Sequence, residues 1–454
     1  MLIEHVIYNF EKIITFGVFL GILITVHEWG HFITAKLMGV SVTEFALGFG
    51  RTIFSKMYKG TNYKLKLFPL GGYVKMAGDE RSKCTGAPDE FYSQPVWKRA
   101  FIVINGPIVN FLLAYICFVL MFMIGYSNPS TRVNGLINGS PAQKAGIQVG
   151  DEIIQVNGKN VYFWDELLES IRASKNEVIT LKILRGKKEL IKKIKPEITA
   201  EKNPFGKYDK VKTIGIDLNS NTIGWLKKGG PAQKAGLLIG DKIIRVGQKD
   251  ILGWHDLQKS IREQKGRQIE ITVLRNDKKI LYYIVPEEIK EKGITRKIIG
   301  IGPEKVKLGN HKFSLLPAMV KGWNKFVEIT SGTYQALYAM ITRTISPKEA
   351  IGGPVMIFGL VADAVDLGIS YFLFMLGSIS LSLAIFNLLP VIPLDGGHLL
   401  LFGIEKIRGK SLSPKTDDII ARIGFGMIML LAIYVFYIDF DRIGVFDKIK
   451  MFFQ

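Results

Sequence analysis

An apolar stretch near the start of this sequence combines the length of a membrane-spanning helix with three polar side chains. It runs from about Ile13 to Ala35 and contains His27, Glu28 and His31. A helix of about 20 apolar residues crosses the hydrocarbon core of a bilayer. Imidazoles and a carboxylate at that depth are unfavourable by several kcal/mol unless they are paired or bind a metal ion. The stretch is therefore predicted to span a membrane and to carry a functional site.

Three further stretches are long and apolar enough to cross a membrane. They run from about Ala100 to Tyr126, Tyr371 to Leu389 and Ile419 to Tyr437. The 454 residues are 48% hydrophobic and have a mean hydropathy of +0.21, which is more apolar than a typical soluble protein. The N-terminal stretch lacks a cationic segment and a cleavage site, so it is not interpreted as a signal peptide. We expect a polytopic α-helical membrane protein with four transmembrane helices.

The distribution of basic residues predicts the orientation of these helices. The segments Lys36 to Arg99 and Lys406 to Lys415 are rich in lysine and arginine, which places them in the cytoplasm by the positive-inside rule. Both termini and the region between the second and third helices are then periplasmic, in a bacterial inner membrane. No disulfide is expected between Cys84 and Cys117, and the net charge of +20 comes without a nucleic-acid recognition motif.

The periplasmic region contains an internal repeat. At an offset of 90 residues, the segment from Ser140 to Arg172 matches the segment from Gly230 to Arg262 at about half of its positions. Each copy contains a Pro-Ala helix start, a Gly-Asp turn, a β-branched strand and an amphipathic helix that begins at Trp164 or Trp254. This order resembles a circularly permuted bacterial PDZ domain of the α/β type.

A PDZ domain binds an extended peptide as an added strand beside an exposed edge. The predicted grooves face the two amphipathic helices. Their residues are Val133, Gly135 and Ile137 in the first copy, and Ile223, Gly224 and Leu226 in the second. In the alternative interpretation, one or both copies cover the membrane face without binding a peptide.

The polar residues of the first stretch form the motif His27-Glu28-Trp29-Gly30-His31, or H-E-x-x-H. Residues four apart in a helix lie about 40° apart around the axis and about 6 Å along it, so both imidazoles can reach one metal ion. Glu28 is then free to act as the general base. One zinc ion is expected per chain, and a catalytic zinc needs a third protein ligand.

The third ligand is sought in a segment after the third stretch, from Asn387 to His398. Prolines and glycines interrupt an apolar helix there, and a broken backbone within a membrane is tolerated where it lines a protein or water-filled site. Asp395 is the preferred ligand, with His398 and Glu44 as alternatives. Asn387 is predicted to donate its amide to the oxyanion of the reaction, or else to cap a helix.

The two motifs together resemble the site-2 protease family of intramembrane zinc metalloproteases. The resembling segments include HEWGH, NLLPVIPLDGG and Asn105-Gly-Pro-Ile-Val-Asn110. The second proline is Pro393, one position later than in the usual family pattern, which puts the local backbone path in question. The family's membrane-associated β-loop is matched by Gly48-Phe49-Gly50 and Gly71-Gly72-Tyr73. The resemblance implies substrate-binding roles for these six residues and for Pro390 and Pro393.

The resemblance also implies partners for the chain. The substrate would be a single-span membrane protein, such as an anti-sigma factor trimmed by another protease, or a remnant signal peptide. Membrane lipid would surround the chain, and the PDZ pair would act as a size filter. From the distribution of basic residues, no nucleic-acid partner is expected. The segment from Val42 to Gly78 contains alternating patterns and could supply a β edge that holds the substrate extended.

The predicted organisation has nine parts. They are a first transmembrane helix (1–35), a cytoplasmic loop with the β-loop (36–99), a second transmembrane helix (100–126), two PDZ domains (127–210 and 211–295), a linker with interfacial amphipathic helices (296–370), a third transmembrane helix with the proline motif (371–400), a cytoplasmic loop (401–418) and a fourth transmembrane helix with a tail (419–454). The amphipathic part, His311 to Ile351, could instead be a soluble helix that packs on the second repeat.

Two competing functions are weighed against proteolysis. A catalytically silent receptor with a structural metal is disfavoured because Glu28 is retained and only three protein ligands are identified. A transporter with broken helices is disfavoured because the chain has few spans and no inverted repeat of them.

Overall fold

The computed structural model describes residues 2–203, 208–264, 267–291, 294–350 and 352–445. The chain divides into two compact units, residues 1–126 with 312–454 and residues 127–311. Ile351, at the end of the predicted interfacial segment, and the tail 446–454 lie outside the described residues. Each unit is described separately.

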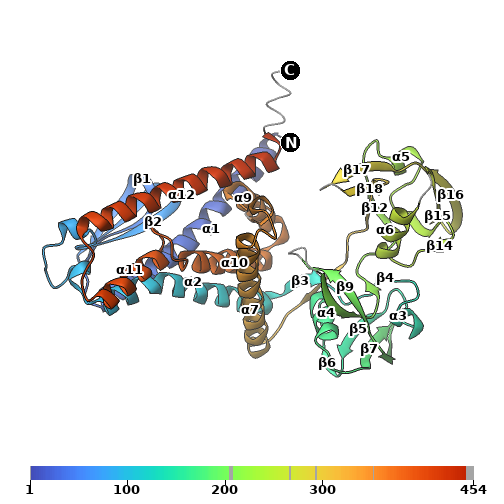
Figure 1. Cartoon of the computed structure of the whole chain (residues 1–454). Coiled ribbons are helices and arrows are strands. Elements are labelled where there is room, and N and C mark those ends of the chain that lie inside the picture. Colours follow the sequence, from blue (N-terminus) through green and yellow to red (C-terminus); the bar gives the residue numbers. More distant parts are fainter. Residues whose placement is uncertain (1, 204–207, 265–266, 292–293, 351, 446–454) are drawn as a thin grey trace, which may run out of the picture. The chain divides into compact units, whose positions relative to one another are not determined.

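The first unit contains four helices that are long and apolar enough to cross a membrane (Figure 1). They are α1 (Leu2–Leu37), α2 (Val96–Ile124), α10 (Ile369–Asn387) and α12 (Pro414–Arg442). The four predicted stretches lie within these helices or overlap them closely, so this part of the prediction is confirmed. The other helices of the unit are α7 (Leu315–Ile341), α8 (Pro347–Ala350), α9 (Pro354–Leu367) and α11 (Asp395–Arg408).

Helix α2 occupies the centre of the first unit, because α1, α7, α10 and α11 all pack against it. Small residues allow close approach between these helices. A side chain at Gly30 of α1 would overlap the carbonyl of Asn105 in α2, and a side chain at Gly377 of α10 would overlap the ring of Phe118. Close backbone contact through small residues is the usual way in which membrane helices associate. It holds α1 and α10 against the same helix.

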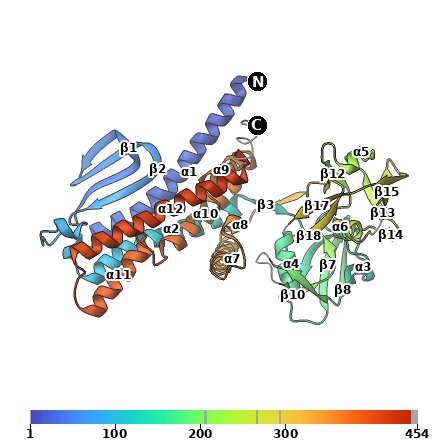
Figure 2. The same cartoon turned by 45° about the horizontal axis from the view of Figure 1, so that its top comes forward.

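The segment between α1 and α2 forms a β-sheet from β1 (Val42–Tyr58) and β2 (Thr61–Met76), which Figure 2 shows beside α1. The first half of β1 lies between the two halves of β2, since Ala46 pairs with both Lys64 and Tyr73. Positive φ angles of 85° at Gly48 and 84° at Gly50 bend β1 after this point, a conformation that glycine adopts readily. Residues 72–76 consequently form one edge of the sheet.

A buried ionic network joins three elements at one end of the helical unit. Glu405 of α11 accepts hydrogen bonds from Arg81 and from Arg99 of α2, the latter at 3.0 Å. Arg81 also binds Asp417 of α12, with 3.0 Å between Nε and Oδ2. Arg99 and Glu405 are both buried. Because breaking one partner of a buried pair leaves an uncompensated charge, the network fixes α2, α11 and the start of α12 together.

The second unit contains the two repeats, and each has the same four-stranded sheet. The strand orders are β6-β5-β7-β8 and β14-β13-β15-β16. Short helices precede the sheets and amphipathic helices cover them. The bounds in the first repeat are α3 (Pro141–Lys144), β5 (Glu152–Val156), β6 (Lys159–Asn160), α4 (Trp164–Arg172), β7 (Ile179–Arg185) and β8 (Lys188–Ile194); those in the second are α5 (Pro231–Lys234), β13 (Lys242–Val246), β14 (Lys249–Asp250), α6 (Trp254–Glu263), β15 (Ile269–Arg275) and β16 (Lys278–Ile284).

The predicted Gly-Asp turns make the same ion pair in both repeats. Asp151 is bound by Arg185 at 2.7 and 2.8 Å, and Asp241 is bound by Arg275 at 2.6 and 2.7 Å. Burial alone would raise the pKa of Asp241, but the hydrogen bonds from Arg275 and the Leu238 amide outweigh it and hold that pKa below its usual value. The turn is therefore fixed to the strand that ends at the arginine.

Each repeat is completed by a short strand that lies beyond its predicted end. Strand β11 (Ile216–Asp217) pairs with β4 (Gly135–Leu136), and β19 (Ile301–Pro303) pairs with β12 (Ile223–Leu226). The domain ends predicted at residues 210 and 295 are therefore corrected to positions after these strands. The remaining strands are β3 (Tyr126–Pro129), β9 (Glu197–Lys202), β10 (Tyr208–Thr213), β17 (Glu287–Glu291), β18 (Ile294–Ile298) and β20 (Leu308–His311).

Candidate metal centre

Three side chains that can bind a metal ion meet between α1 and the start of α11. His27 Nε2 lies 3.3 Å from His31 Nε2 and 3.3 Å from Asp395 Oδ2. His31 Nε2 lies 3.6 Å from Asp395 Oδ1. Among the described residues, His27, His31 and Asp395 form the one group of three or more potential ligands whose donor atoms lie within 4.8 Å of one another.

The spacing of these atoms fits a tetrahedral zinc ion. Zn–N and Zn–O bonds of about 2.0–2.1 Å in tetrahedral geometry place neighbouring donor atoms about 3.3–3.4 Å apart. The observed separations of 3.3, 3.3 and 3.6 Å are close to that value. Asp395 Oδ2 is also buried without a well-aligned hydrogen bond among the described residues, and such an orphaned carboxylate oxygen is unfavourable unless a cation accompanies it. The residues therefore fit a bound zinc ion.

Asp395 reaches this position because the chain breaks between α10 and α11. Residues 388–394 leave the helical path, and Asp395 is the first residue of α11. Gly396 and Gly397 lack side chains that would overlap the backbone of Leu388 and Ile392, so the broken segment folds back over the first turn of α11. The positive end of a helix also favours a carboxylate in its first turn. The glycines after Asp395 thus permit the loop that presents the carboxylate.

Helix α2 contacts the second nitrogen of each imidazole. His31 Nδ1 lies 3.0 Å from the carbonyl oxygen of Ile102, and His27 Nδ1 lies 3.2 Å from Asn110 Nδ2. Neither Ile102 nor Asn110 was predicted to take part in the site. The contact with Ile102 could not be predicted, because every residue has a backbone carbonyl. The contact with Asn110 could have been predicted, because a polar side chain within an apolar span usually has a polar partner.

Gly106 of α2 faces both imidazoles. A Cβ atom at this position would overlap His31 Nε2 and lie 2.9 Å from His27 Cε1. The atoms it would displace are the ones that converge on the candidate metal position. Any side chain at residue 106 must therefore move α2 or rotate the imidazoles.

We expect Gly106→Ala to lower zinc occupancy more than tenfold, because effects of this size follow from misplacing the groups that orient metal ligands. The measurement is the zinc content of purified protein after dialysis against a graded series of chelator concentrations. Gly21→Ala is the matched control, since Gly21 lies in α1 with no atom within 4 Å of its added Cβ. Equal zinc retention by the two variants would contradict the prediction.

Glu28 faces the edge of the β-sheet. A Cβ atom on Gly72 would lie 3.3 Å from Glu28 Cγ, and the backbone of Val74 lies close to the Glu28 carboxylate. The edge segment 72–76 therefore lies directly beside the residue predicted to be the general base. Gly72 is required here because a larger side chain would meet Ile24 and the carbonyl of Ala46 as well.

Asn387 and the two alternative ligands lie in different surroundings. Asn387 ends α10, and its Nδ2 lies 3.3 Å from His27 Nε2, so its amide is at the candidate metal position rather than at the start of a helix. His398 is packed near the ring of Phe402. Glu44 accepts hydrogen bonds from Lys64 at 2.7 Å and Tyr73 at 2.8 Å. Neither His398 nor Glu44 belongs to the group of converging ligands.

The residues for which the family resemblance implied substrate binding lie in two places. Leu47 pairs with Gly72 and Ala46 with Tyr73, so Gly48–Gly50 and Gly71–Tyr73 are neighbours in the sheet, where the Phe49 ring covers Gly71. Pro390 and Pro393 belong to the segment before Asp395, in which the Ile392–Pro393 peptide bond is cis. Of these β-loop residues, Gly72 lies beside Glu28, and the prolines lie in the segment that leads to Asp395.

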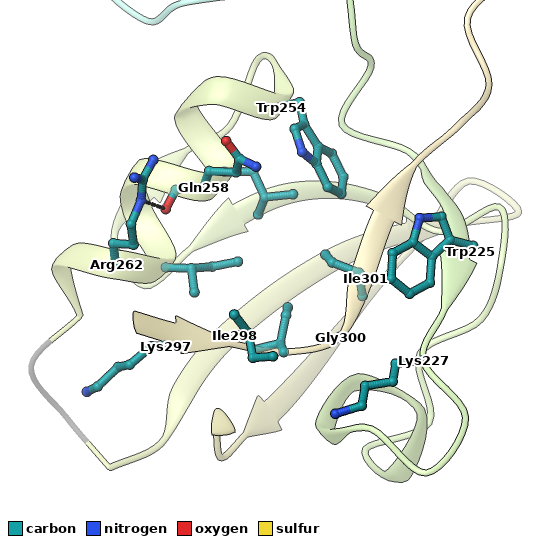
Figure 3. A pocket seen from close by; sticks show the side chains of 12 residues that line it. Trp225, Lys227, Trp254, Gln258, Arg262, Lys297, Ile298, Gly300 and Ile301 are labelled. Atoms are coloured by element: carbon teal, nitrogen blue, oxygen red, sulfur yellow. Dashed lines mark hydrogen bonds between the residues drawn. The ribbon is translucent and has the colours of Figure 1, made fainter. Parts of the chain in front are cut away.

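Most residues predicted to line the grooves of the repeats are covered by neighbouring parts of the chain, and the grooves themselves stay a prediction. Val133 and Ile223 are buried in the two cores. The backbone of Gly253 covers Gly135, and the backbone of Glu304 covers Gly224. The Ile137 amide and Leu226 face the strands that complete the two repeats. An open pocket of about 370 Å³ lies instead between α6 and residues 297–301 (Figure 3). Trp225 also lines it, so β12 contributes one side chain that the prediction passed over.

The sequence matches known proteins over nearly its whole length. The profile of peptidase family M50 matches residues 15–431. The regulator of sigma-E protease RseP of Escherichia coli is 31% identical over 94% of this chain and 98% of its own length. A putative zinc metalloprotease of Neisseria meningitidis is 31% identical over 93% of this chain and 97% of its own. A putative zinc metalloprotease of Vibrio cholerae is 30% identical over 96% and 99%, respectively.

Proposed function

Because the chain belongs to peptidase family M50, we propose that it is a zinc-dependent endopeptidase that cleaves the membrane-spanning segment of single-span proteins. The observation that carries this proposal is the convergence of His27, His31 and Asp395. The two histidines flank Glu28 in α1, a helix that is long and apolar enough to cross a membrane. Three protein ligands leave the fourth position of a tetrahedral zinc ion for an exchangeable ligand, which a catalytic site requires and a structural site does not.

The bound zinc ion would polarise the scissile carbonyl and lower the pKa of water at the site. His27, His31 and Asp395 would hold the ion, one per chain. Glu28 takes a proton from the attacking water and then gives it to the leaving amine. The Asn387 amide, 3.3 Å from His27 Nε2, donates a hydrogen bond to the oxyanion that forms during attack.

The substrate must be extended before it can be cut, because the carbonyls of a transmembrane helix are hydrogen-bonded within the helix. The edge segment 72–76 offers backbone groups to an added strand. Its position beside Glu28 would bring a peptide paired with this edge to the general base. The remaining residues implied by the family resemblance are proposed to line the path of this peptide; they are Gly48–Gly50, Gly71, Pro390 and Pro393.

We also propose a substrate class and a location. The Escherichia coli relative is named for the regulation of sigma-E, which supports a trimmed anti-sigma factor as our proposed substrate, with remnant signal peptides as a second group.

The distribution of basic residues supports a proposed location in a bacterial inner membrane. In this proposal the metal site lies near the cytoplasmic side, and the PDZ-like repeats lie in the periplasm, where they bind peptides or exclude bulky partners.

The proposal is tested with purified protein and a panel of single-span substrates. Cleavage is expected with zinc present, and it is expected to stop on addition of a chelator and to return when zinc is restored. Substrates whose periplasmic part has been shortened should be cut faster than those that carry a folded periplasmic domain. Tight zinc binding without cleavage of any substrate would favour the receptor hypothesis instead.

A further inference from the structure

We propose that Asn110 fixes the proton of His27 on Nδ1, so that Nε2 is free to bind the metal ion. This inference rests on the proposed zinc site and assigns a positioning role to a residue outside the ligand set. Asn110 is fully buried, with 0% exposure, on the central helix α2. Its side-chain amide lies 3.2 Å from His27 Nδ1.

Both imidazoles point Nε2 at the same place. The two Nε2 atoms are 3.3 Å apart, and the Asp395 carboxylate approaches each of them. A neutral imidazole carries one proton, and the nitrogen that binds a metal must be the one without it. The proton of each ring therefore belongs on Nδ1, which then needs a hydrogen-bond acceptor.

The group that faces His31 Nδ1 can only accept a hydrogen bond. The carbonyl oxygen of Ile102 lies 3.0 Å from His31 Nδ1, and a carbonyl cannot donate. His27 faces an amide, which presents either an oxygen or an NH₂ group depending on the rotation of its terminal torsion. With Nδ2 toward His27, Asn110 Oδ1 is left buried without a partner. Rotation of the amide turns Oδ1 toward Nδ1–H and supplies the acceptor, while the NH₂ group takes the place that Oδ1 had.

The other nitrogen of the same ring points at the candidate metal position. His27 Nε2 lies 3.3 Å from Asp395 Oδ2 and 3.3 Å from Asn387 Nδ2. A proton on Nε2 would occupy the lone pair that the metal ion needs, so the ring proton belongs on Nδ1. The backbone of Asn110 is held in place because Ser380 of α10 donates to its carbonyl oxygen at 2.9 Å.

Three variants of the full-length protein separate this role from packing. Asn110→Leu keeps the side-chain volume and removes the acceptor. Asn110→Asp restores an acceptor, and carboxylates are common partners of zinc-bound histidines. Asn105→Leu is the matched control, because Asn105 also lies in α2 and bonds α1 through Gly30 and Thr34 without touching either ring.

Zinc affinity, measured by competition with a chromophoric chelator in detergent, should fall about 10–100-fold in Asn110→Leu. It should stay near the natural value in Asn110→Asp and in Asn105→Leu. Equal affinity of Asn110→Leu and the natural protein overturns the inference, as does an equal loss in Asn110→Asp or in Asn105→Leu. Failure of the natural protein to bind zinc would instead remove the proposed function.

A second measurement does not depend on the folding of a variant. Nitrogen NMR of the natural protein with ¹⁵N-labelled histidine, in its zinc-loaded state, distinguishes a protonated Nδ1 from a protonated Nε2. The expected result for His27 is a proton on Nδ1 and a metal-bound Nε2. The opposite assignment would overturn the inference even if Asn110→Leu could not be purified.

Discussion

Glu28→Gln protein should retain its zinc and lose cleavage of a membrane substrate by about 10²–10⁴-fold, the usual contribution of a general base. Glutamine has nearly the same shape as glutamate and can still meet the backbone of Val74, but it cannot take a proton from water. Because Glu28 is not one of the converging ligands, the metal content should be unaffected. The measurement pairs a cleavage time course with metal analysis of the same preparation.

Glu11→Gln provides the control for this prediction. Glu11 is an exposed glutamate of the same helix α1, and its replacement should leave both cleavage and zinc content as they are. Undiminished cleavage by Glu28→Gln would exclude Glu28 as the base. Loss of zinc along with activity would show instead that Glu28 supports the metal site.

Asp395→Ala is expected to remove zinc from the protein after dialysis against a chelator and to abolish cleavage. The substitution leaves two imidazoles, and two protein ligands are fewer than the three of a catalytic zinc site. It also removes a carboxylate whose Oδ2 is buried beside His27, so the imidazoles lose their one nearby negative partner among the converging ligands. Metal analysis and the cleavage assay measure the two losses separately.

The alternative ligands give the matched comparison for Asp395. Glu44 is engaged by Lys64 and Tyr73, and its pKa is held below the usual value by those hydrogen bonds. We therefore expect Glu44→Ala and His398→Ala to retain zinc at the chelator concentration that strips Asp395→Ala. If His398→Ala or Glu44→Ala loses zinc while Asp395→Ala keeps it, the third ligand has been assigned incorrectly.

The helical unit was predictable because its signals are long and local. A run of 20 apolar residues has few alternative structures, and the four runs all correspond to candidate spans. The break before Asp395 was predicted from prolines and glycines that a helix interior does not accommodate. The choice among Asp395, His398 and Glu44 was harder, because a ligand more than 300 residues from His31 leaves no spacing pattern in the sequence.

The closing strands of the repeats could not be predicted, for a physical reason. The strands that complete each repeat contain two or three residues, which is too short to show an alternating pattern. They also lie after the segments that match at an offset of 90 residues. The match therefore did not predict that Ile214 and Ile299 belong to the cores. The sequence pattern indicated that two copies exist and left their closing strands unassigned.

The proposed pairing of the substrate with the sheet edge beside Glu28 would constrain which bonds can be cut. In an extended peptide paired with residues 72–76, successive carbonyls point alternately toward that edge and away from it. Only every second carbonyl can then face the imidazoles, and a slip of one residue would exchange the two sets. Secondary cleavage positions in a substrate should consequently lie an even number of residues from the main one, a periodicity that mass spectrometry of the products would reveal.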